Sequence, residues 1–213
     1  MLQPRRLEPP GRGRGVSEIR IERLTGGRLK LLLPDLARLR IAVFRAFPYL
    51  YEGSLEYEQR YLQTYLEAAD SVIVGAFDGE AVVGASTGLP LGHEPPSLTD
   101  TFTAHGYEVP KVFYFGESVL LPDYRGHGVG VAFFREREAH ARALGRFDWA
   151  AFCGVVRPAD HPRRPPDYIP LDAFWRKRGF APVPGMVGSL TWRDLDETEE
   201  SAKPMQFWVK RLT

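Results

Sequence analysis

Residues 120–130 read Leu-Leu-Pro-Asp-Tyr-Arg-Gly-His-Gly-Val-Gly, and they join two segments of different periodicity. The preceding run, 111–121, is largely apolar and predicts a strand, whereas 131–144 lacks Pro and Gly and places apolar side chains on one side of a helix. Where a strand leads directly into a glycine-rich helix start, several unpaired backbone N–H groups point in the same direction. They lie at the positive end of the helix dipole. The segment from Arg125 to Gly130 is therefore predicted to bind an anion.

Pyrophosphate is an anion that suits this turn. Gly128 and Gly130 lack a Cβ atom, so phosphate oxygens can approach the main chain closely, and Arg125 adds a positive charge at the rim. The alternative is a turn that needs glycine only for its backbone angles, with His127 simply facing solvent. The turn by itself leaves both interpretations open.

Two other nucleotide motifs fit this turn less well. A P-loop ends in Gly-Lys-Ser/Thr, but here Gly130 is followed by Val131-Ala132, which supply neither a lysine nor a metal-binding hydroxyl. A dinucleotide fingerprint needs a third glycine, and the position counted from Gly126 holds Val131.

The rest of the chain predicts a mixed α/β sheet in a single domain. Residues 1–16, rich in Arg, Pro and Gly, are expected to form a flexible tail, which leaves 17–213 as the domain. Asp78-Gly79, between two valine-rich runs, is the residue pair that a type I′ hairpin turn favours. The predicted strands are 19–24, 71–77, 80–89, 111–121, 147–156, 186–192 and 205–211, and the predicted helices are 36–47, 55–66, 131–144 and 171–178, with one helical turn near 100–104.

Composition narrows the class of partner. The 28 basic and 27 acidic residues give a formal charge of +1, which favours neither a nucleic acid nor a membrane surface. One cysteine excludes an internal disulfide, no Cys/His spacing suits a metal, and no long apolar run or signal sequence is apparent. We expect a soluble, cytoplasmic protein that acts on a small molecule without a metal.

The turn, together with a second motif, resembles the GCN5-related N-acetyltransferase (GNAT) superfamily. The family motif Arg/Gln-x-x-Gly-x-Gly/Ala is matched by Arg125, Gly128 and Gly130, and the ending Phe174-Trp175-Arg176-Lys177-Arg178-Gly179-Phe180 resembles that of the family's last helix. The resemblance covers roughly 17–213. It implies a mostly antiparallel central sheet of about seven strands flanked by about four helices, and acetyl-coenzyme A as co-substrate.

The resemblance also implies a cofactor site. Two central strands are expected to splay apart, with the pantetheine arm in the gap. The residues implied in coenzyme binding are Val119, Leu120, Leu121, Arg125, Gly126, His127, Gly128, Val129, Gly130 and Trp175. This sequence departs from the family at Trp175, where many members have a tyrosine that protonates the leaving thiolate, and it contains no asparagine after the fifth strand or elsewhere.

Candidate catalytic groups follow from the chemistry of acyl transfer to an amine, which must lose a proton before or during attack. Glu117 is the only acid within 111–121, and we interpret it as the base; the alternative is an acid that pairs with arginine or orients the acceptor. Tyr168 and Ser118 are candidate proton donors to the thiolate, although a thiol of pKa near 8.5 hardly needs one. Cys153, on a predicted strand, is interpreted as a small buried hydrophobe.

The acceptor is the least determined feature. Tyrosines in the two predicted helices and the loop joining them, with nearby acids, would suit a cationic amine, but such tyrosines are often core residues. The residues are Tyr49, Tyr51, Tyr57 and Tyr61 with Glu52, Glu56 and Glu58. We expect acetyl transfer to a small-molecule amine by direct attack; a non-catalytic acyl-coenzyme A sensor and a protein N-terminal or lysine acetyltransferase remain alternatives, and a homodimer is possible.

Overall fold

The computed structural model describes residues 18–212, so the flexible tail predicted for 1–16 lies outside the described residues. Eight strands form one sheet in the order β1-β2-β3-β4-β6-β8-β7, and β5 also pairs with β3. The strands are β1 (Arg20–Leu24), β2 (Val72–Asp78), β3 (Ala81–Pro90), β4 (Val112–Tyr114), β5 (Ser118–Leu120), β6 (Trp149–Val155), β7 (Ala181–Trp192) and β8 (Ser201–Arg211).

Five α-helices and three short 3₁₀ turns connect the strands. The helices are α1 (Gly26–Phe44), α2 (Leu55–Glu67), α3 (Pro96–Ala104), α4 (Val129–Ala143) and α5 (Asp172–Lys177), and the turns are η1 (Leu91–His93), η2 (Val109–Lys111) and η3 (Pro122–Tyr124). All described strand pairs are antiparallel except β4–β6. The predicted fold class is therefore confirmed.

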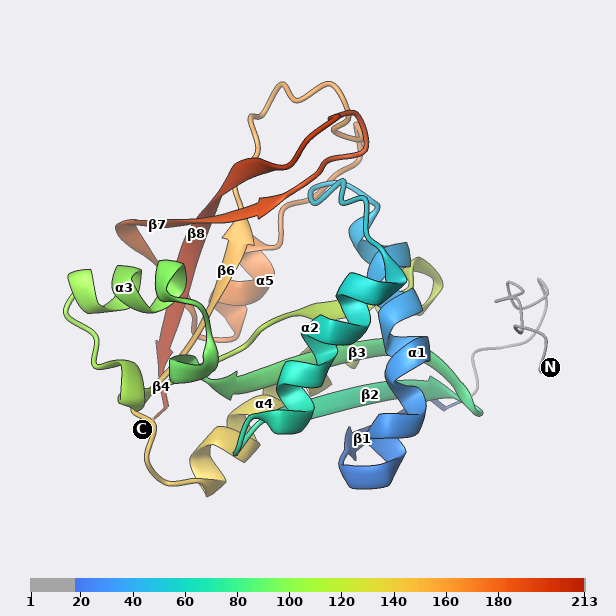
Figure 1. Ribbon diagram of the computed structural model, residues 1–213, viewed down its shortest axis with the longest axis vertical. Coiled ribbons are helices and arrows are strands. Elements are labelled where there is room, and N and C mark those ends of the chain that lie inside the picture. Colours follow the sequence, from blue (N-terminus) through green and yellow to red (C-terminus); the bar gives the residue numbers. More distant parts are fainter. Residues whose placement is uncertain (1–17, 213) are drawn as a thin grey trace.

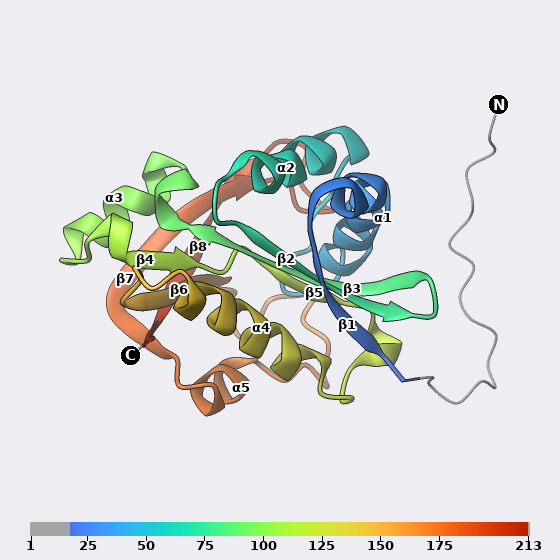
Figure 2. The same ribbon diagram turned by 90° about the horizontal axis from the view of Figure 1, so that it is seen from below.

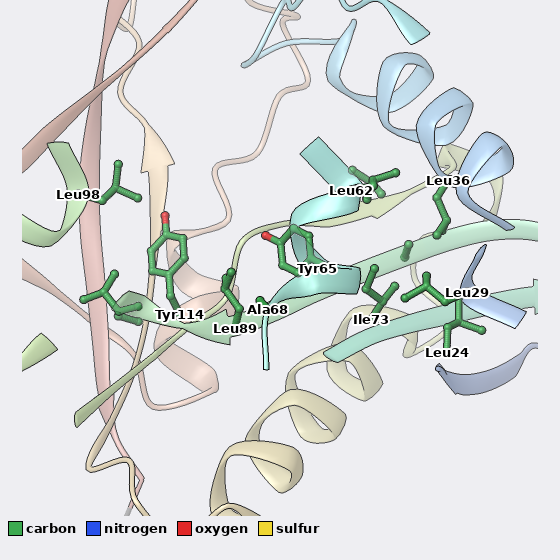
Figure 3. Close-up of a cluster of buried hydrophobic side chains, with 14 of the residues drawn as sticks. Leu24, Leu29, Leu36, Leu62, Tyr65, Ala68, Ile73, Leu89, Leu98 and Tyr114 are labelled. Atoms are coloured by element: carbon green, nitrogen blue, oxygen red, sulfur yellow. The ribbon is translucent and has the colours of Figure 1, made fainter. Parts of the chain in front are cut away.

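Helices cover both faces of the sheet (Figure 1). The helices α1, α2 and α3 lie on one face, and Figure 2 shows α4 and α5 on the other. Successive side chains of β2 point to opposite faces of the sheet and so contribute to both hydrophobic layers. Ile73 packs under α1 and α2, whereas Val74 packs on the α4 side. Figure 3 shows the first layer, with Leu36 and Leu62 above Ile73.

Two predicted boundaries are corrected. The helix expected from Leu36 begins at Gly26 and continues through Pro34, because Leu29 and Leu36 extend the same buried stripe. The hairpin turn also differs. Asp78 pairs with Ala81, and only Gly79 among the turn residues has a positive φ, of 57°, whereas a type I′ turn requires two.

The predicted strand 111–121 is two strands, β4 and β5, separated by a β-bulge. Thr87 of β3 faces two residues, because its carbonyl accepts from Gly116 N (3.2 Å) while its Oγ1 accepts from Glu117 N (3.2 Å). Beyond the bond from Phe115 N to the Ala151 carbonyl (2.7 Å), β5 pairs with β3 and β6 pairs with β8. The two central strands therefore part, as the family resemblance implies.

Candidate active site

The bulge decides where Glu117 points. Side chains alternate between the faces of a strand, so in an uninterrupted strand Glu117 and Tyr114 would face opposite sides. The extra residue reverses the alternation, and both side chains point to the face covered by α1 and α2. Glu117 is consequently brought to the helices, at the place where β5 and β6 part.

Two helices hold the carboxylate of Glu117. Arg40 of α1 places Nη1 2.5 Å from Oε1, and the hydroxyl of Tyr61 in α2 donates to Oε2 at 2.8 Å. Arg40 also donates from Nε to Glu58, which is fully buried. The pairing with arginine that the sequence left as an alternative for Glu117 is thus present.

Arg137 of α4 fixes the bulge from the opposite face of the sheet. Its side chain is only 1% exposed, and it donates to the carbonyls of Thr87 (3.2 Å) and Glu117 (3.0 Å) and to Oγ of Ser118 (2.8 Å). Burial lowers the pKa of Arg137 to about 9, which still leaves the guanidinium charged at neutral pH. Ser118, a candidate proton donor, is therefore engaged with Arg137 on the face opposite to Glu117.

Tyrosine hydroxyls gather beside Glu117. Tyr61 and Tyr65 lie 2.8 Å apart at their hydroxyl oxygens, and Figure 3 shows the Tyr65 and Tyr114 hydroxyls above the same face of the sheet. Burial and the charge of Glu117 raise the pKa values of Tyr61 and Tyr65. A Cβ atom at Gly116 would lie 2.1 Å from the Tyr65 hydroxyl, so only glycine fits here.

The glycine-rich turn has the geometry of an anion site. Gly126 and Gly128 adopt positive φ values of 84° and 81°, and Gly128 is the N-cap of α4, with no side chain capping the free N–H groups of its first turn. Arg125 is exposed at the rim. These residues fit a pyrophosphate, which would be held by the backbone N–H groups and by Arg125.

One glycine of this turn has a role that differs from the prediction. The missing Cβ of Gly130 makes room for the ring of Phe174, at 3.3 Å, and does not open space for phosphate. His127 is exposed and lines a groove of 360 Å³ together with Ile19 and Ile21, which precede or form β1.

The family resemblance implies that main-chain N–H groups around Val119 to Leu121 meet the coenzyme, but two of these N–H groups point toward β3. The Leu121 N–H donates to the Val83 carbonyl at 2.9 Å, so it is already occupied. Alternate residues of an antiparallel ladder point the same way, and Val119, which pairs with Ala85, therefore also faces β3. Only Leu120 directs its N–H to the side where β6 has parted.

Tyr168, the other candidate proton donor, lies in the loop before α5. Its ring packs edge-on against Phe47 at 4.7 Å between centroids, and its hydroxyl is close enough to Tyr49 to interact electrostatically. Tyr49 is itself fixed through its carbonyl, which accepts from Arg157 (2.8 Å) and Trp192 (3.1 Å). Tyr168 thus borders the face on which Glu117 lies, and its role as an acid stays a prediction.

Cys153 of β6 is held as a thiol. Its Sγ atom lies 3.0 Å from the Tyr114 hydroxyl, and burial raises its pKa to about 12. Very little thiolate is present at neutral pH, which argues against an acyl-enzyme at this residue.

We expect Cys153→Ala to keep at least half of the wild-type acetyl transfer rate. Alkylation of the native thiol by iodoacetamide at pH 8 should be at least tenfold slower than in the urea-unfolded chain, because the reactive thiolate is suppressed by burial. Loss of turnover in the alanine variant, together with rapid alkylation of the native thiol, would contradict this expectation.

The comparisons with known proteins bear on this arrangement. The model of the acetyltransferase (GNAT) family matches residues 36–163, more than half of the chain, including the bulge and the glycine-rich turn. The chain belongs to the GNAT acetyltransferase family. No curated protein shows significant sequence similarity to it.

Solved GNAT structures share the fold at low sequence identity. An N-acetyltransferase from Staphylococcus aureus Mu50 matches with a TM-score of 0.59 and 12% identity, covering 92% of this chain and 100% of that one. Ribosomal-protein-alanine N-acetyltransferase from Brucella melitensis gives 0.58 and 16%, covering 90% and 99%. Arabidopsis thaliana NAA60, solved in complex with acetyl-CoA, gives 0.57 and 14%, covering 91% and 98%.

Trp175 occupies the position where many GNAT members have a tyrosine. Its ring packs against β6, where a Cβ atom at Gly154 would lie 2.9 Å from it, and against Phe152 and Trp208 at 5.1 and 5.0 Å. Gly154 therefore makes room for the larger indole. These contacts give Trp175 a packing role, while its contact with the coenzyme stays a prediction.

The predicted amine pocket is corrected in part. Of the predicted tyrosines, only Tyr49 and Tyr61 lie near Glu117. Glu58 forms an ion pair with Arg40, and Glu56 is exposed. The residues holding Glu117 and the bulge that sequence reasoning missed are Arg40, Thr87 and Arg137. A signal existed for two of them, since Arg40 and Arg137 stand at helical spacing within apolar stripes, where an unpaired charge would be costly.

Membrane-spanning helices and metal sites are both absent from the described residues 18–212. No helix in this range is long and apolar enough to cross a bilayer. Within the same range, no group of three His, Cys, Asp or Glu side chains is arranged to hold a metal ion.

Proposed function

We propose that this GNAT protein transfers the acetyl group of acetyl-coenzyme A to the amine of a small molecule by direct attack. The observation that carries the proposal is the placement of Glu117. Its carboxylate is held on the bulge where two strands part, beside buried tyrosine hydroxyls. The segment of chain that holds the bulge continues into the uncapped start of α4. When bound, acetyl-coenzyme A supplies an activated acetyl thioester.

The chain's own residues bind and orient the reactants. The N–H groups at the start of α4 and Arg125 bind the pyrophosphate, and the N–H of Leu120 faces the thioester region. The carboxylate of Glu117 attracts an ammonium group, and the electron-rich face of Tyr49 favours a cation. The high pKa of Cys153 supports direct attack over an acyl-enzyme.

Acetylation of a protein N-terminus is a second candidate. It is supported by the name of one structural relative, the ribosomal-protein-alanine N-acetyltransferase. Because its identity to this chain is 16%, that relative supports the fold and leaves the acceptor class to be tested. A non-catalytic acyl-coenzyme A sensor is the third candidate, favoured by Trp175 in place of tyrosine.

The cofactor site is tested by calorimetric titration of acetyl-coenzyme A into the wild type, Arg125→Glu and Arg135→Glu. Both arginines are exposed and both substitutions change the charge equally, but Arg135 lies on α4 beyond its first turn. We expect Arg125→Glu to weaken binding by about 10-fold to 100-fold, the value of one charge-assisted contact, and Arg135→Glu to leave it unchanged. Equal effects of the two variants, or no binding by the wild type, would contradict the site.

The acceptor class is tested by thiol release with putrescine, tyramine and phenethylamine, and with a short peptide that has a free N-terminal alanine. Turnover of an amine and not of the peptide is the expected result. Turnover of the peptide alone would establish the second candidate, and slow hydrolysis that no acceptor accelerates would favour the sensor.

A further inference from the structure

Glu117 is held at both of its ends by arginines that lie on opposite faces of the sheet. Arg40 of α1 pairs with the carboxylate, whereas Arg137 of α4 donates from Nη1 to the main-chain carbonyl of Glu117 at 3.0 Å. The same Nη1 atom donates to the carbonyl of Thr87 in β3 at 3.2 Å. Arg137 therefore bridges the two sides of the bulge.

The guanidinium of Arg137 is buried without an acidic partner. It donates to three main-chain carbonyls and one hydroxyl, and within residues 18–212 it forms no ion pair. The ring centroids of Phe115 and Phe134 lie 4.2 and 4.9 Å from its Cζ atom, so aromatic faces cover the cation. Burying a charge has a desolvation cost that an apolar side chain would avoid. The cation thus serves the bulge in a way that packing alone does not require.

The helix α4 carries both Arg137 and the anion site. Gly128 is the N-cap of α4, and Arg137 follows nine residues later. A rise of about 1.5 Å per residue places the two about 14 Å apart along the helix axis. The Nε atom of Arg137 also donates to the carbonyl of Phe133 at 3.3 Å, which ties the side chain to its own helix. One continuous helix therefore sets the separation between the anion site and the bulge.

We propose that Arg137 is a positioning residue for acetyl transfer, and that it holds Glu117 at a fixed distance from the coenzyme bound at the start of α4. This inference rests on the proposed function. Arg137 acts through the main chain of the bulge. The N–H groups that bind the pyrophosphate belong to the first turn of α4, so Arg137 affects the rate of transfer and leaves coenzyme binding unchanged.

Arg137→Met tests this separation of rate from binding. Methionine keeps most of the side-chain volume but has no donor for the carbonyls of Thr87 and Glu117. At saturating acetyl-coenzyme A and acceptor, we expect kcat to fall by about 100-fold, because a displacement of about 1 Å in a reacting group is enough for such a loss. The calorimetric Kd for acetyl-coenzyme A should stay at the wild-type value.

Arg135→Met is the matched control. Arg135 lies on the same helix with its side chain 71% exposed, so its loss should change neither kcat nor Kd. Arg137→Lys keeps a positive charge but lacks the planar fork that reaches two carbonyls and a hydroxyl, and its kcat should recover to about 10-fold below wild type. A residue that served stability alone would leave kcat unchanged at temperatures where the variants are folded.

Nuclear magnetic resonance of the protein without coenzyme or acceptor gives a readout that is independent of activity. The carbonyl ¹³C signal of Glu117 and the amide signal of Ser118 belong to one peptide group, which the bond from Arg137 polarises. Both signals should shift in Arg137→Met and should stay in place in Arg135→Met.

The outcomes distinguish this inference from the proposed function. If the wild type turns over neither an amine nor the peptide, the proposed function fails, and the positioning role fails with it. If an acceptor is turned over, the role of Arg137 alone is overturned by wild-type kcat in Arg137→Met, by coenzyme binding weakened as in Arg125→Glu, or by unshifted Glu117 and Ser118 signals. Should Arg137→Met fail to fold, wild-type kcat in Arg137→Lys overturns the role equally.

Discussion

Replacing Arg40 by methionine should lower the free energy of unfolding by about 3–5 kcal/mol, the cost of removing one partner from a buried ion pair. Arg40 is 7% exposed and lies between two carboxylates, Glu58 and Glu117. Without the guanidinium, Glu58 and Glu117 would remain buried with no cation between α1, α2 and the bulge. Methionine keeps most of the side-chain volume, so the effect reports the charge more than a cavity.

Urea unfolding of Arg40→Met measures this difference, and Arg60→Met is the matched control. Arg60 lies on α2, its side chain is 73% exposed, and its pair with Glu56 spans 3.8 Å. Exposed pairs contribute about 0.2–1 kcal/mol, so the control should lose no more than that. A loss below about 1 kcal/mol in Arg40→Met would mean that solvent reaches the pair and that Glu117 is not held as described.

Gly116→Ala should reduce acetyl transfer by about 100-fold, because a displacement of about 1 Å in a reacting group is enough for such a loss. The added Cβ atom would lie 2.1 Å from the Tyr65 hydroxyl and 2.7 Å from Oγ1 of Thr87. One is the end of a rigid ring and the other accepts the Glu117 N–H, so relief of the clash moves the bulge. Overpacking of this kind should also cost about 1–3 kcal/mol of stability.

Gly27→Ala is the control for this substitution. Gly27 is exposed in the first turn of α1 and has open space where its Cβ atom would be, so alanine there should be neutral or stabilising by up to about 1 kcal/mol, with normal turnover. Thiol release and urea unfolding of both variants check the prediction. Normal turnover in Gly116→Ala would show that the position of Glu117 is not critical.

Local patterns were sufficient for the elements on either side of the site. The valine-rich runs of β2 and β3 and the glycine-rich start of α4 are short-range signals, because each depends on residues close in sequence. The same reasoning placed a β-strand over 111–121 and failed at Gly116 and Glu117. A bulge is set by the partner strand, here by Thr87 some thirty residues earlier, and the sequence of the bulged strand carries little sign of it.

The sequence by itself determined the family-type sheet, the turn from Arg125 to Gly130 and the candidacy of Glu117, since strand and helix periods and turn chemistry are local properties. Only the tertiary structure decided which face Glu117 occupies and that Arg40 and Tyr61 hold it. The reason is physical. A one-residue change in register reverses every side chain that follows, and the environment of a carboxyl group depends on elements distant in sequence.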